Sequence, residues 1–236
     1  MPPLISPPPP TLGAFTHTLF RFTTGIRAGQ VASVRGANDE VLLTYRSFAS
    51  VVGVIAAFLA GIVAVAGAAG VLLLFYQGAP LRALLVLVLT IVFSIVIAML
   101  VPRTNVTLYE ESHPALTISQ RAVFPSATYI VATPNGGHLA ELRKSFLSRL
   151  GRNRWTITQE GRYLGEALEE SFGAALLRKL FGKFSRKFEA NLRITYGGVD
   201  AGRIVRRSTD SLELTGDALD RRVAVALATL VLGREP

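Results

Sequence analysis

Two apolar blocks interrupt a chain that elsewhere alternates between hydrophobic and polar positions. Val51–Phe75 carries no charged residue, and at about 25 residues it exceeds the roughly 20 that cross the hydrocarbon layer as a helix. Ala83–Val101 is also uncharged, and its length of about 19 residues is just sufficient. The turn-rich stretch Tyr76–Arg82 joins them. The pattern predicts a transmembrane helical hairpin whose two flanking segments lie on the same side of the membrane.

The distribution of positive charge around the hairpin predicts its orientation. Cytoplasmic flanks of membrane helices carry an excess of Lys and Arg. We therefore expect a multi-pass protein of the inner cell membrane with both termini in the cytoplasm. Neither block has an ionisable residue in its interior, which argues against a transport path through the hairpin. The flanks hold Arg35, Arg46, Arg103 and Arg121, whereas the connecting loop holds only Arg82.

Small residues at spacings of four mark one face of the first apolar block. They are Gly53, Ala57 and Gly61, and such a face lets two helices approach closely. We expect it to be the helix-packing face of the hairpin, with the second apolar block as its partner. Self-association of two copies through the same face is the alternative.

Outside these blocks, short runs alternate hydrophobic and polar residues with the period of a β-strand, and turn residues separate them. Pro134–Gly137 and Tyr196–Asp200 give the strongest hairpin signals. The number of strands is sufficient to close a barrel. The expected strands are Leu19–Thr24, Gln30–Arg35, Glu40–Arg46, Asn105–Tyr109, Ala115–Gln120, Thr128–Thr133, His138–Arg143, Arg154–Thr158, Tyr163–Leu168, Ala190–Tyr196, Ala201–Arg206 and Ser211–Leu214.

The C-terminal segment changes from the strand period to a helical one. It begins with the capping candidates Asp217 and Asp220 and ends at Gly233. Its apolar run, Val223–Leu232, has about 10 residues, which is too short to span a bilayer. A helix that is apolar on all sides must be enclosed. The sequence therefore predicts an α+β membrane protein: a β-barrel of about twelve strands around a hydrophobic C-terminal helix, with an inserted transmembrane helical hairpin.

This arrangement resembles the tubby C-terminal-like fold, which tubby proteins, phospholipid scramblases and plant LURP-one-related proteins share. The resemblance is carried by turn–strand units at Gly137, Gly161 and Gly198, by the segment Arg143–Trp155 and by the helix Leu219–Ala228. It implies a single β-domain that the hairpin interrupts. The expected parts are a Pro-rich disordered tail at 1–16, the first strands at 17–48, the hairpin at 49–102 and the remaining barrel at 103–236.

The chain also departs from that family in ways that limit what the resemblance implies. Eukaryotic scramblases have a Cys-rich palmitoylated stretch, and this chain has no Cys. No segment matches the spaced Asp/Glu loop that calcium requires. Calcium-triggered lipid movement is therefore not expected. Tubby domains bind phosphoinositide headgroups through basic residues, but no position-by-position match is visible.

Composition narrows the chemistry that the chain can perform. Half of the residues are hydrophobic and the mean hydropathy is +0.41. The absence of Cys excludes disulfides, thiol catalysis and Cys-based zinc sites. His17, His113 and His138 lie in no metal-ligand pattern, and no nucleophile elbow or phosphate loop is readable. We therefore expect a protein that is not an enzyme and that binds no cofactor or metal.

Two acidic pairs, Glu110–Glu111 and Glu169–Glu170, could suggest a carboxylate dyad. Neighbouring residues of a strand point to opposite faces, which is the wrong geometry for a dyad. We expect both pairs to face solvent.

The net charge of +9 favours anionic partners, and the densest basic region runs from Arg143 to Arg193. Part of this region interleaves basic residues with Leu and Phe at helix-like spacing, a combination that suits an anionic lipid surface. A solvated charged loop that serves only topology is the alternative, and nucleic acid is not expected because no nucleic-acid-binding motif is present. The candidate lipid-binding residues are Arg143, Lys144, Arg149, Arg152, Arg154, Arg178, Lys179, Lys183, Arg186 and Lys187.

These features favour a membrane-anchored cytoplasmic domain that binds anionic lipid headgroups without catalysis, so membrane lipids are the expected partner. A membrane-tethered scaffold that binds a protein partner is the first alternative. Phospholipid scrambling is the second, and it is disfavoured because the hairpin has no polar groove for headgroups.

Overall fold

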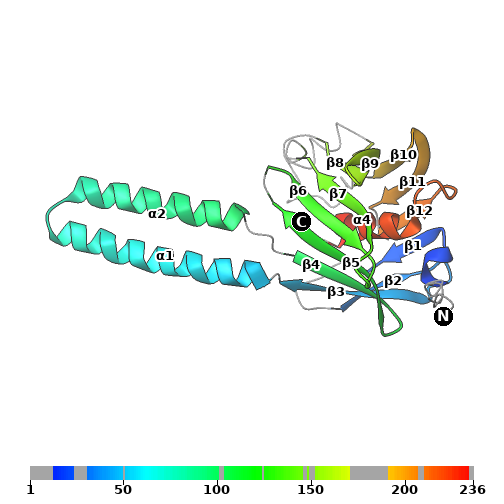
Figure 1. The fold of residues 1–236 in the computed structure, drawn as a ribbon, viewed down its shortest axis with the longest axis horizontal. Coiled ribbons are helices and arrows are strands. Elements are labelled where there is room, and N and C mark those ends of the chain that lie inside the picture. The colour runs from blue at the N-terminus through cyan, green and yellow to red at the C-terminus, as the bar shows by residue number, and fades with distance from the viewer. Residues whose placement is uncertain are drawn as a thin grey trace, which may run out of the picture.

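The structure, a computed structural model, describes residues 13–23, 31–49, 51–100, 104–123, 125–145, 148, 152–170, 191–206 and 210–233. Its described strands form a closed antiparallel barrel in which each strand pairs with the next in sequence and β1 closes against β12 (Figure 1). The strands are β1 Leu19–Phe22, β2 Val31–Arg35, β3 Val41–Ala49, β4 Thr104–Glu110, β5 His113–Ala122, β6 Ala127–Ala132, β7 His138–Lys144, β8 Arg154–Gln159, β9 Arg162–Glu169, β10 Leu192–Tyr196, β11 Val199–Val205 and β12 Asp210–Leu214.

All twelve predicted strands are confirmed, and their ends differ from the prediction by no more than three residues. The turn prediction at Tyr196–Asp200 is also confirmed, since Gly197 and Gly198 have φ of +58° and +82° and join β10 to β11. Two consecutive positive φ values are the requirement of a tight hairpin turn whose twist matches that of the strands.

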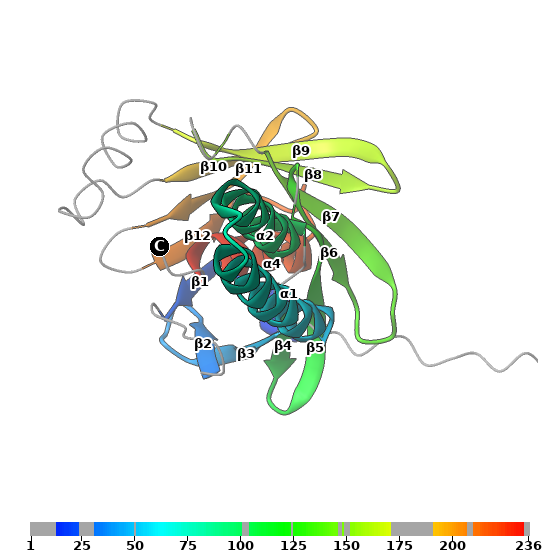
Figure 2. The same ribbon diagram turned by 90° about the vertical axis from the view of Figure 1, so that its left-hand side faces the viewer.

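The up-and-down order of the strands gives the barrel two distinct ends. Helix α1 begins two residues after β3, and α2 ends shortly before β4. Because the strands alternate in direction, every link that follows an odd-numbered strand lies at the same end as the helices. We call this the hairpin end, and the opposite one the far end. Figure 2 shows the strands as a ring around α4, with α1 and α2 projecting from one end of the ring.

Helix α4, Arg221–Leu232, occupies the barrel interior, as predicted. It starts at the far end, where the Asp220 carboxylate accepts a hydrogen bond from the Arg222 backbone N–H at 2.9 Å. It ends at Gly233, whose N–H donates to the Thr229 carbonyl at 2.9 Å. Nine of its twelve residues are buried, and full burial of a large apolar side chain contributes about 1.5–3 kcal/mol. The helix is therefore the centre of the hydrophobic core.

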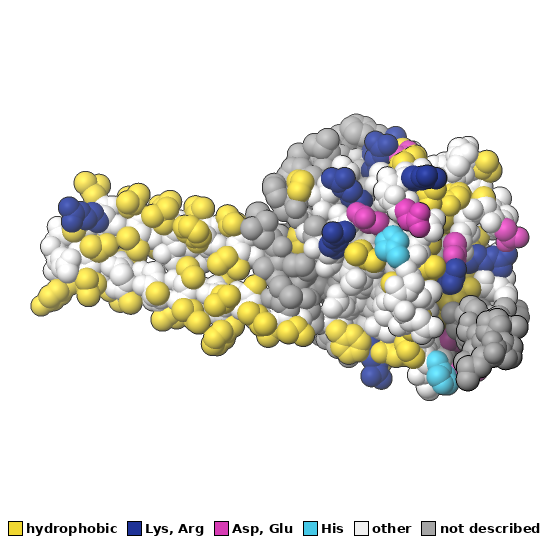
Figure 3. Space-filling model, in the orientation of Figure 1, with side chains coloured by type: hydrophobic (Ala, Val, Ile, Leu, Met, Phe, Trp, Pro, Cys, Tyr) yellow, Lys and Arg dark blue, Asp and Glu magenta, His cyan; other side chains and the backbone are white. Residues whose placement is uncertain are grey.

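The hairpin consists of α1, Val51–Tyr76, and α2, Pro80–Leu100. Gly53–Tyr76 and Pro80–Ile97 are long and apolar enough to cross a membrane, with mean hydropathies of 2.5 and 2.6. Figure 3 shows hydrophobic side chains along the visible surface of the projecting pair. The predicted connecting loop is too long by four residues, because Tyr76 is the last residue of α1 and Pro80 is the first residue of α2. Proline suits that position, where its missing N–H would have no partner.

The packing face of α1 differs from the one predicted. A Cβ at Gly67 would collide with Thr90 of α2, whereas one at Gly61 would meet nothing within 4 Å. Ala57 and Gly61 are exposed, so the prediction that they face α2 is wrong, and only Gly53 of the three is partly covered. At 100° per residue, Gly61 lies roughly 120° around the helix from Gly67. A repeat of four drifts around the helix and cannot mark one straight seam.

The expected disordered tail needs one correction. Residues 1–12 lie outside the described residues, but Gly13–Thr16 form a 3-10 helix, η1, in which Ala14 and Phe15 are buried. The Ala14 N–H donates to the Glu110 carboxylate at 2.7 Å. The apolar pair Ala14–Phe15 therefore belongs to the barrel core rather than to a solvated tail.

Candidate functional site at the hairpin end of the barrel

The links between strands differ in composition according to whether they follow an even-numbered or an odd-numbered strand. The far-end turns are all described, contain no Lys or Arg, and hold Asp39, Glu40, Glu111, Glu160, Asp217 and Asp220. In sequence, the links that join strands at the hairpin end contain only two acidic residues, Glu170 and Glu189. The same links contain Arg27, Arg103, Arg149, Arg152, Arg178, Lys179, Lys183, Arg186, Lys187, Arg206 and Arg207. Of these basic residues, only Arg152 and Arg206 lie among the described residues, and the others belong to these links by sequence alone.

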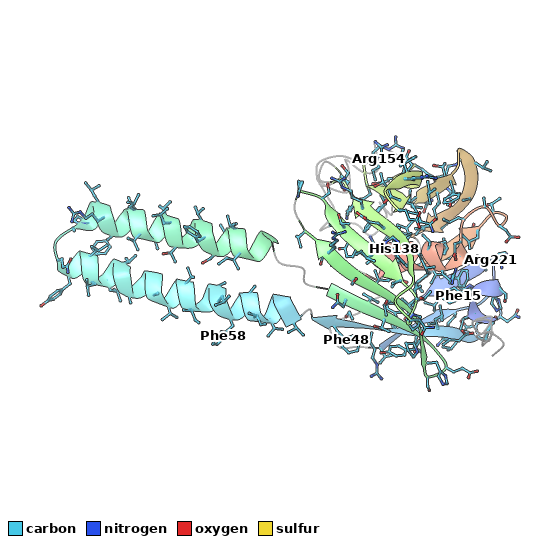
Figure 4. All side chains as sticks on the ribbon, in the orientation of Figure 1. Phe15, Phe48, Phe58, His138, Arg154 and Arg221 are labelled. Atoms are coloured by element: carbon cyan, nitrogen blue, oxygen red, sulfur yellow. The ribbon has the colours of Figure 1, made fainter. Side chains whose placement is uncertain are left out.

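Four of the ten predicted lipid-binding residues are described, and all four lie near the hairpin end of β7 and β8. Only Arg143 is exposed and without an ion pair among the described residues. Arg154 forms an ion pair with Glu166 at 2.7 Å (Figure 4 labels Arg154). Such a pair leaves less of the Arg154 guanidinium available to an external anion. The other six, Arg149, Arg178, Lys179, Lys183, Arg186 and Lys187, lie outside the described residues.

Arg152 has a structural role in the described link. Its guanidinium donates to the backbone carbonyls of Glu169 and Glu170, with Nε 2.7 Å from the Glu169 oxygen and Nη2 3.1 Å from the Glu170 oxygen. In return, the Asn153 N–H donates to the Glu169 carboxylate at 2.9 Å. These bonds tie the start of β8 to the end of β9, and they engage the donors that a lipid phosphate would need.

Lys144 points toward the barrel interior rather than outward. Its ammonium lies 5.5 Å from the centre of the Trp155 ring, and Trp155 in turn lies 5.8 Å from the ring of Tyr129. Trp155 is buried in the barrel core. A cation over an aromatic ring is a stabilising contact, so Lys144 supports the inner rim of the hairpin end.

Three polar side chains near this end of the barrel are buried. Tyr45 is 2% exposed, Glu169 1% and Asp210 3%. The expectation that Glu169 faces solvent is therefore wrong, because alternation turns Glu169 inward and Glu170 outward along β9. Burial, and to a smaller degree the charge of Asp210, raises the pKa of the Tyr45 hydroxyl. Tyr45 is neutral at physiological pH.

Two exposed cations near this end are not among the predicted lipid-binding residues. Arg46 on β3 and Arg121 on β5 are exposed and have no ion pair among the described residues. Arg121 lies at a register shift between Gln120 and Ala122, and such bulges redirect a side chain. Both were counted for topology but not as binding residues. The alternation along β3 predicts that the Arg46 side chain points outward. No sequence pattern predicts the direction of Arg121, because the bulge interrupts the alternation of β5.

The described residues contain no group of three or more His, Cys, Asp or Glu side chains that could hold a metal ion. Comparisons with known proteins add no assignment: no family model, no curated protein and no solved structure matches this chain. The architecture established here is a closed twelve-stranded antiparallel barrel with a C-terminal helix and an inserted apolar helix pair.

Proposed function

We propose that this protein is anchored by the α1–α2 hairpin in the inner cell membrane, and that the hairpin end of its barrel binds anionic lipid headgroups without catalysis. The observation that carries this proposal is the charge of the links: in sequence, the links that follow odd-numbered strands are strongly basic, whereas the described turns of the far end contain carboxylates and no Lys or Arg. A Lys or Arg near an anionic membrane surface contributes about 1 kcal/mol. An orientation with the basic links toward the headgroups and the far-end carboxylates in water is therefore electrostatically favourable.

The same charges support a cytoplasmic position for the barrel and both termini. Only Arg82 lies at the α1–α2 turn, whereas the barrel side is strongly basic. An excess of Lys and Arg close to the membrane ends is typical of cytoplasmic flanks.

We further propose a relationship to the tubby C-terminal-like fold of scramblases and tubby proteins. The support is architectural: a closed antiparallel meander around a buried C-terminal helix. We do not extend the calcium site or the scrambling activity of that family to this chain. The described spans hold no charged residue except Arg82 at the start of α2, so they offer headgroups no charged path across the hydrocarbon.

A protein-binding scaffold is the second candidate. The observation that favours it is a pair of exposed carboxylates in the far-end turns, Glu111 and Glu160, for which the described residues show no ion pair. The two functions are compatible, because they use opposite ends of the barrel.

The lipid proposal can be tested on the full-length chain in nanodiscs, because a protein without Cys accepts single-Cys labels. A donor dye on Ser126→Cys, in the β5–β6 link of the hairpin end, is paired with acceptor dyes on lipid headgroups. Adding phosphatidylglycerol to phosphatidylcholine should raise energy transfer at low salt. The rise should vanish near 1 M salt, where the Debye length is about 3 Å.

Asn135→Cys, in the exposed β6–β7 turn of the far end, is the matched control and should show no rise. Equal transfer from Ser126→Cys in both lipid compositions at low salt would contradict the proposal.

A further inference from the structure

The outer surface of the barrel has two different sides. On β8–β11, arginines pair with carboxylates. Arg154 lies 2.7 Å from Glu166, Arg193 lies 2.8 Å from Asp200, and Arg203 lies 2.5 Å from Glu170. Each pair brings opposite charges together on the outer wall. This wall is therefore close to neutral toward its hairpin end, and its exposed apolar residues, Tyr163 and Val199, lie at the far end instead.

The wall formed by β2–β5 lacks this compensation at its hairpin end. The described outward residues there include Arg46 and Arg121, and neither has an ion pair among the described residues. The other outward residues in this part of β3, β4 and β5 are uncharged. All but Phe48 are Ser, Thr or Asn. They are Thr44, Phe48, Asn105, Thr107, Thr117 and Ser119.

Exposed apolar side chains accompany these cations. Phe48 is 47% exposed and Val31 is 53% exposed. Val31 is the register partner of Arg46 on the neighbouring strand, and Phe48 lies two residues beyond Arg46 on the same side of β3. The register therefore places the exposed Arg46 between two exposed apolar residues on the outer face of β2 and β3, and we call these three residues the patch.

The patch lies where the barrel meets the hairpin. Phe48 precedes the first residue of α1 by three positions, which corresponds to roughly 10 Å of extended chain. The polar layer of a bilayer is about 5–8 Å thick on each side of the hydrocarbon. Figure 4 shows Phe48 at the hairpin-side corner of the barrel, on the side where α1 and its Phe58 lie.

We propose that the β2–β5 wall is the side of the barrel that contacts the bilayer, with Phe48 inserted in the interfacial layer and Arg46 and Arg121 on lipid phosphates. The β8–β11 wall faces water. Aromatic side chains favour the interface, and guanidinium groups bind phosphate through paired hydrogen bonds. Every phospholipid carries a phosphate, so this contact forms with zwitterionic lipids as well as anionic ones. The proposal rests on the membrane placement of the proposed function.

Spin labels on the full-length chain in nanodiscs test this side preference. Phe48→Cys places a label in the patch, and Leu168→Cys places one near the hairpin end of β9, on the charge-paired wall. The Phe48→Cys label should be accessible to oxygen dissolved in lipid and shielded from a water-soluble nickel chelate. The Leu168→Cys label should show the reverse. The difference should persist in pure phosphatidylcholine and at 0.5 M salt, a screening length of roughly 4 Å.

The outcomes separate this inference from the proposed function. Equal nickel accessibility at Phe48→Cys and Leu168→Cys would overturn the side preference, even if Ser126→Cys still responds to phosphatidylglycerol. A buried Phe48→Cys label with no response at Ser126→Cys would keep the side preference and reject the anionic-lipid function. The fluorescence of Trp155, the single tryptophan, checks that both labelled chains are folded, since loss of burial would shift its emission.

Discussion

At the scale of single residues, the arginines near the hairpin end have different structural roles. Arg152 donates to two backbone carbonyls and Arg154 pairs with Glu166, whereas Arg143 is exposed and has no ion pair among the described residues. Substitutions can separate these roles. Replacing an arginine that holds the backbone lowers the free energy of unfolding, whereas replacing an exposed arginine without partners leaves it nearly unchanged.

Arg152→Ala should lower the free energy of unfolding by about 1–2 kcal/mol, since it leaves the carbonyls of Glu169 and Glu170 without their charged donor. Arg143→Ala should change it by less than about 0.5 kcal/mol. Chemical denaturation of the full chain in nanodiscs, followed by Trp155 emission, measures both. Equal losses in the two variants would show that Arg152 has no special structural role.

Tyr45 gives a pH-dependent prediction. Its hydroxyl is buried and has no hydrogen-bond partner among the described residues, so Tyr45→Phe should be close to neutral at pH 7. The raised pKa means that the unfolded chain releases this proton near pH 10 while the folded chain retains it. Stability is therefore lost as the pH rises above about 10, and Tyr45→Phe removes this part of the loss.

The measurement is the difference in unfolding free energy between Tyr45→Phe and the unmodified chain at pH 7 and above pH 10. A difference that stays constant across this range would contradict the buried, neutral state of Tyr45.

At the scale of elements, two contacts fix the helices: the cap of α4 and the seam between α1 and α2. Asp220→Ala should cost about 1 kcal/mol, because the Arg222 N–H loses its acceptor at the helix start. Asp217→Ala is the control, since Asp217 forms only an exposed ion pair with Arg221, whose contribution is about 0–1 kcal/mol. Thermal unfolding of both variants compares the cap with a surface charge. A larger loss for Asp217→Ala would contradict the capping role.

Gly67→Val should destabilise the helix pair by about 1–3 kcal/mol, because the added side chain collides with Thr90. Gly61→Val adds the same atoms to the open face of α1 and should leave the pair intact. The distance between spin labels on α1 and α2 in nanodiscs reports the result: it should increase for Gly67→Val alone. An increase in both variants would reject Gly67 as the seam residue.

At the scale of the whole molecule, function depends on the difference between the two ends. Arg143→Glu reverses an exposed charge near the hairpin end, and Arg162→Glu reverses an exposed charge at the far end. Each charge near the membrane contributes about 1 kcal/mol to association with anionic lipid. Arg143→Glu removes a positive charge and adds a negative one, so it should weaken the association with phosphatidylglycerol by about 2 kcal/mol. Arg162→Glu should leave it nearly unchanged. Energy transfer from Ser126→Cys measures both, and equal effects would show that net charge rather than its position governs binding.

Local patterns in the sequence determined most of the architecture. Alternation along segments such as Arg154–Thr158 identified strands, because side chains of a strand point to opposite faces regardless of its partners. The uncharged length of Val51–Phe75 identified a long apolar helix, and the all-apolar run Val223–Leu232 required an enclosing structure. The candidate site was also partly visible, since the basic links are a property of the sequence.

Tertiary structure decided the relations between distant residues. Closure of the barrel assigned alternate links to one end, paired Arg154 with Glu166 on the neighbouring strand, and left Arg46 and Arg121 without an ion pair in the described part of the chain. It also turned Lys144 and Glu169 inward and chose Gly67, rather than Gly61, to meet α2. A sequence specifies spacing along one element, whereas strand register and helix rotation depend on the partner that each element packs against.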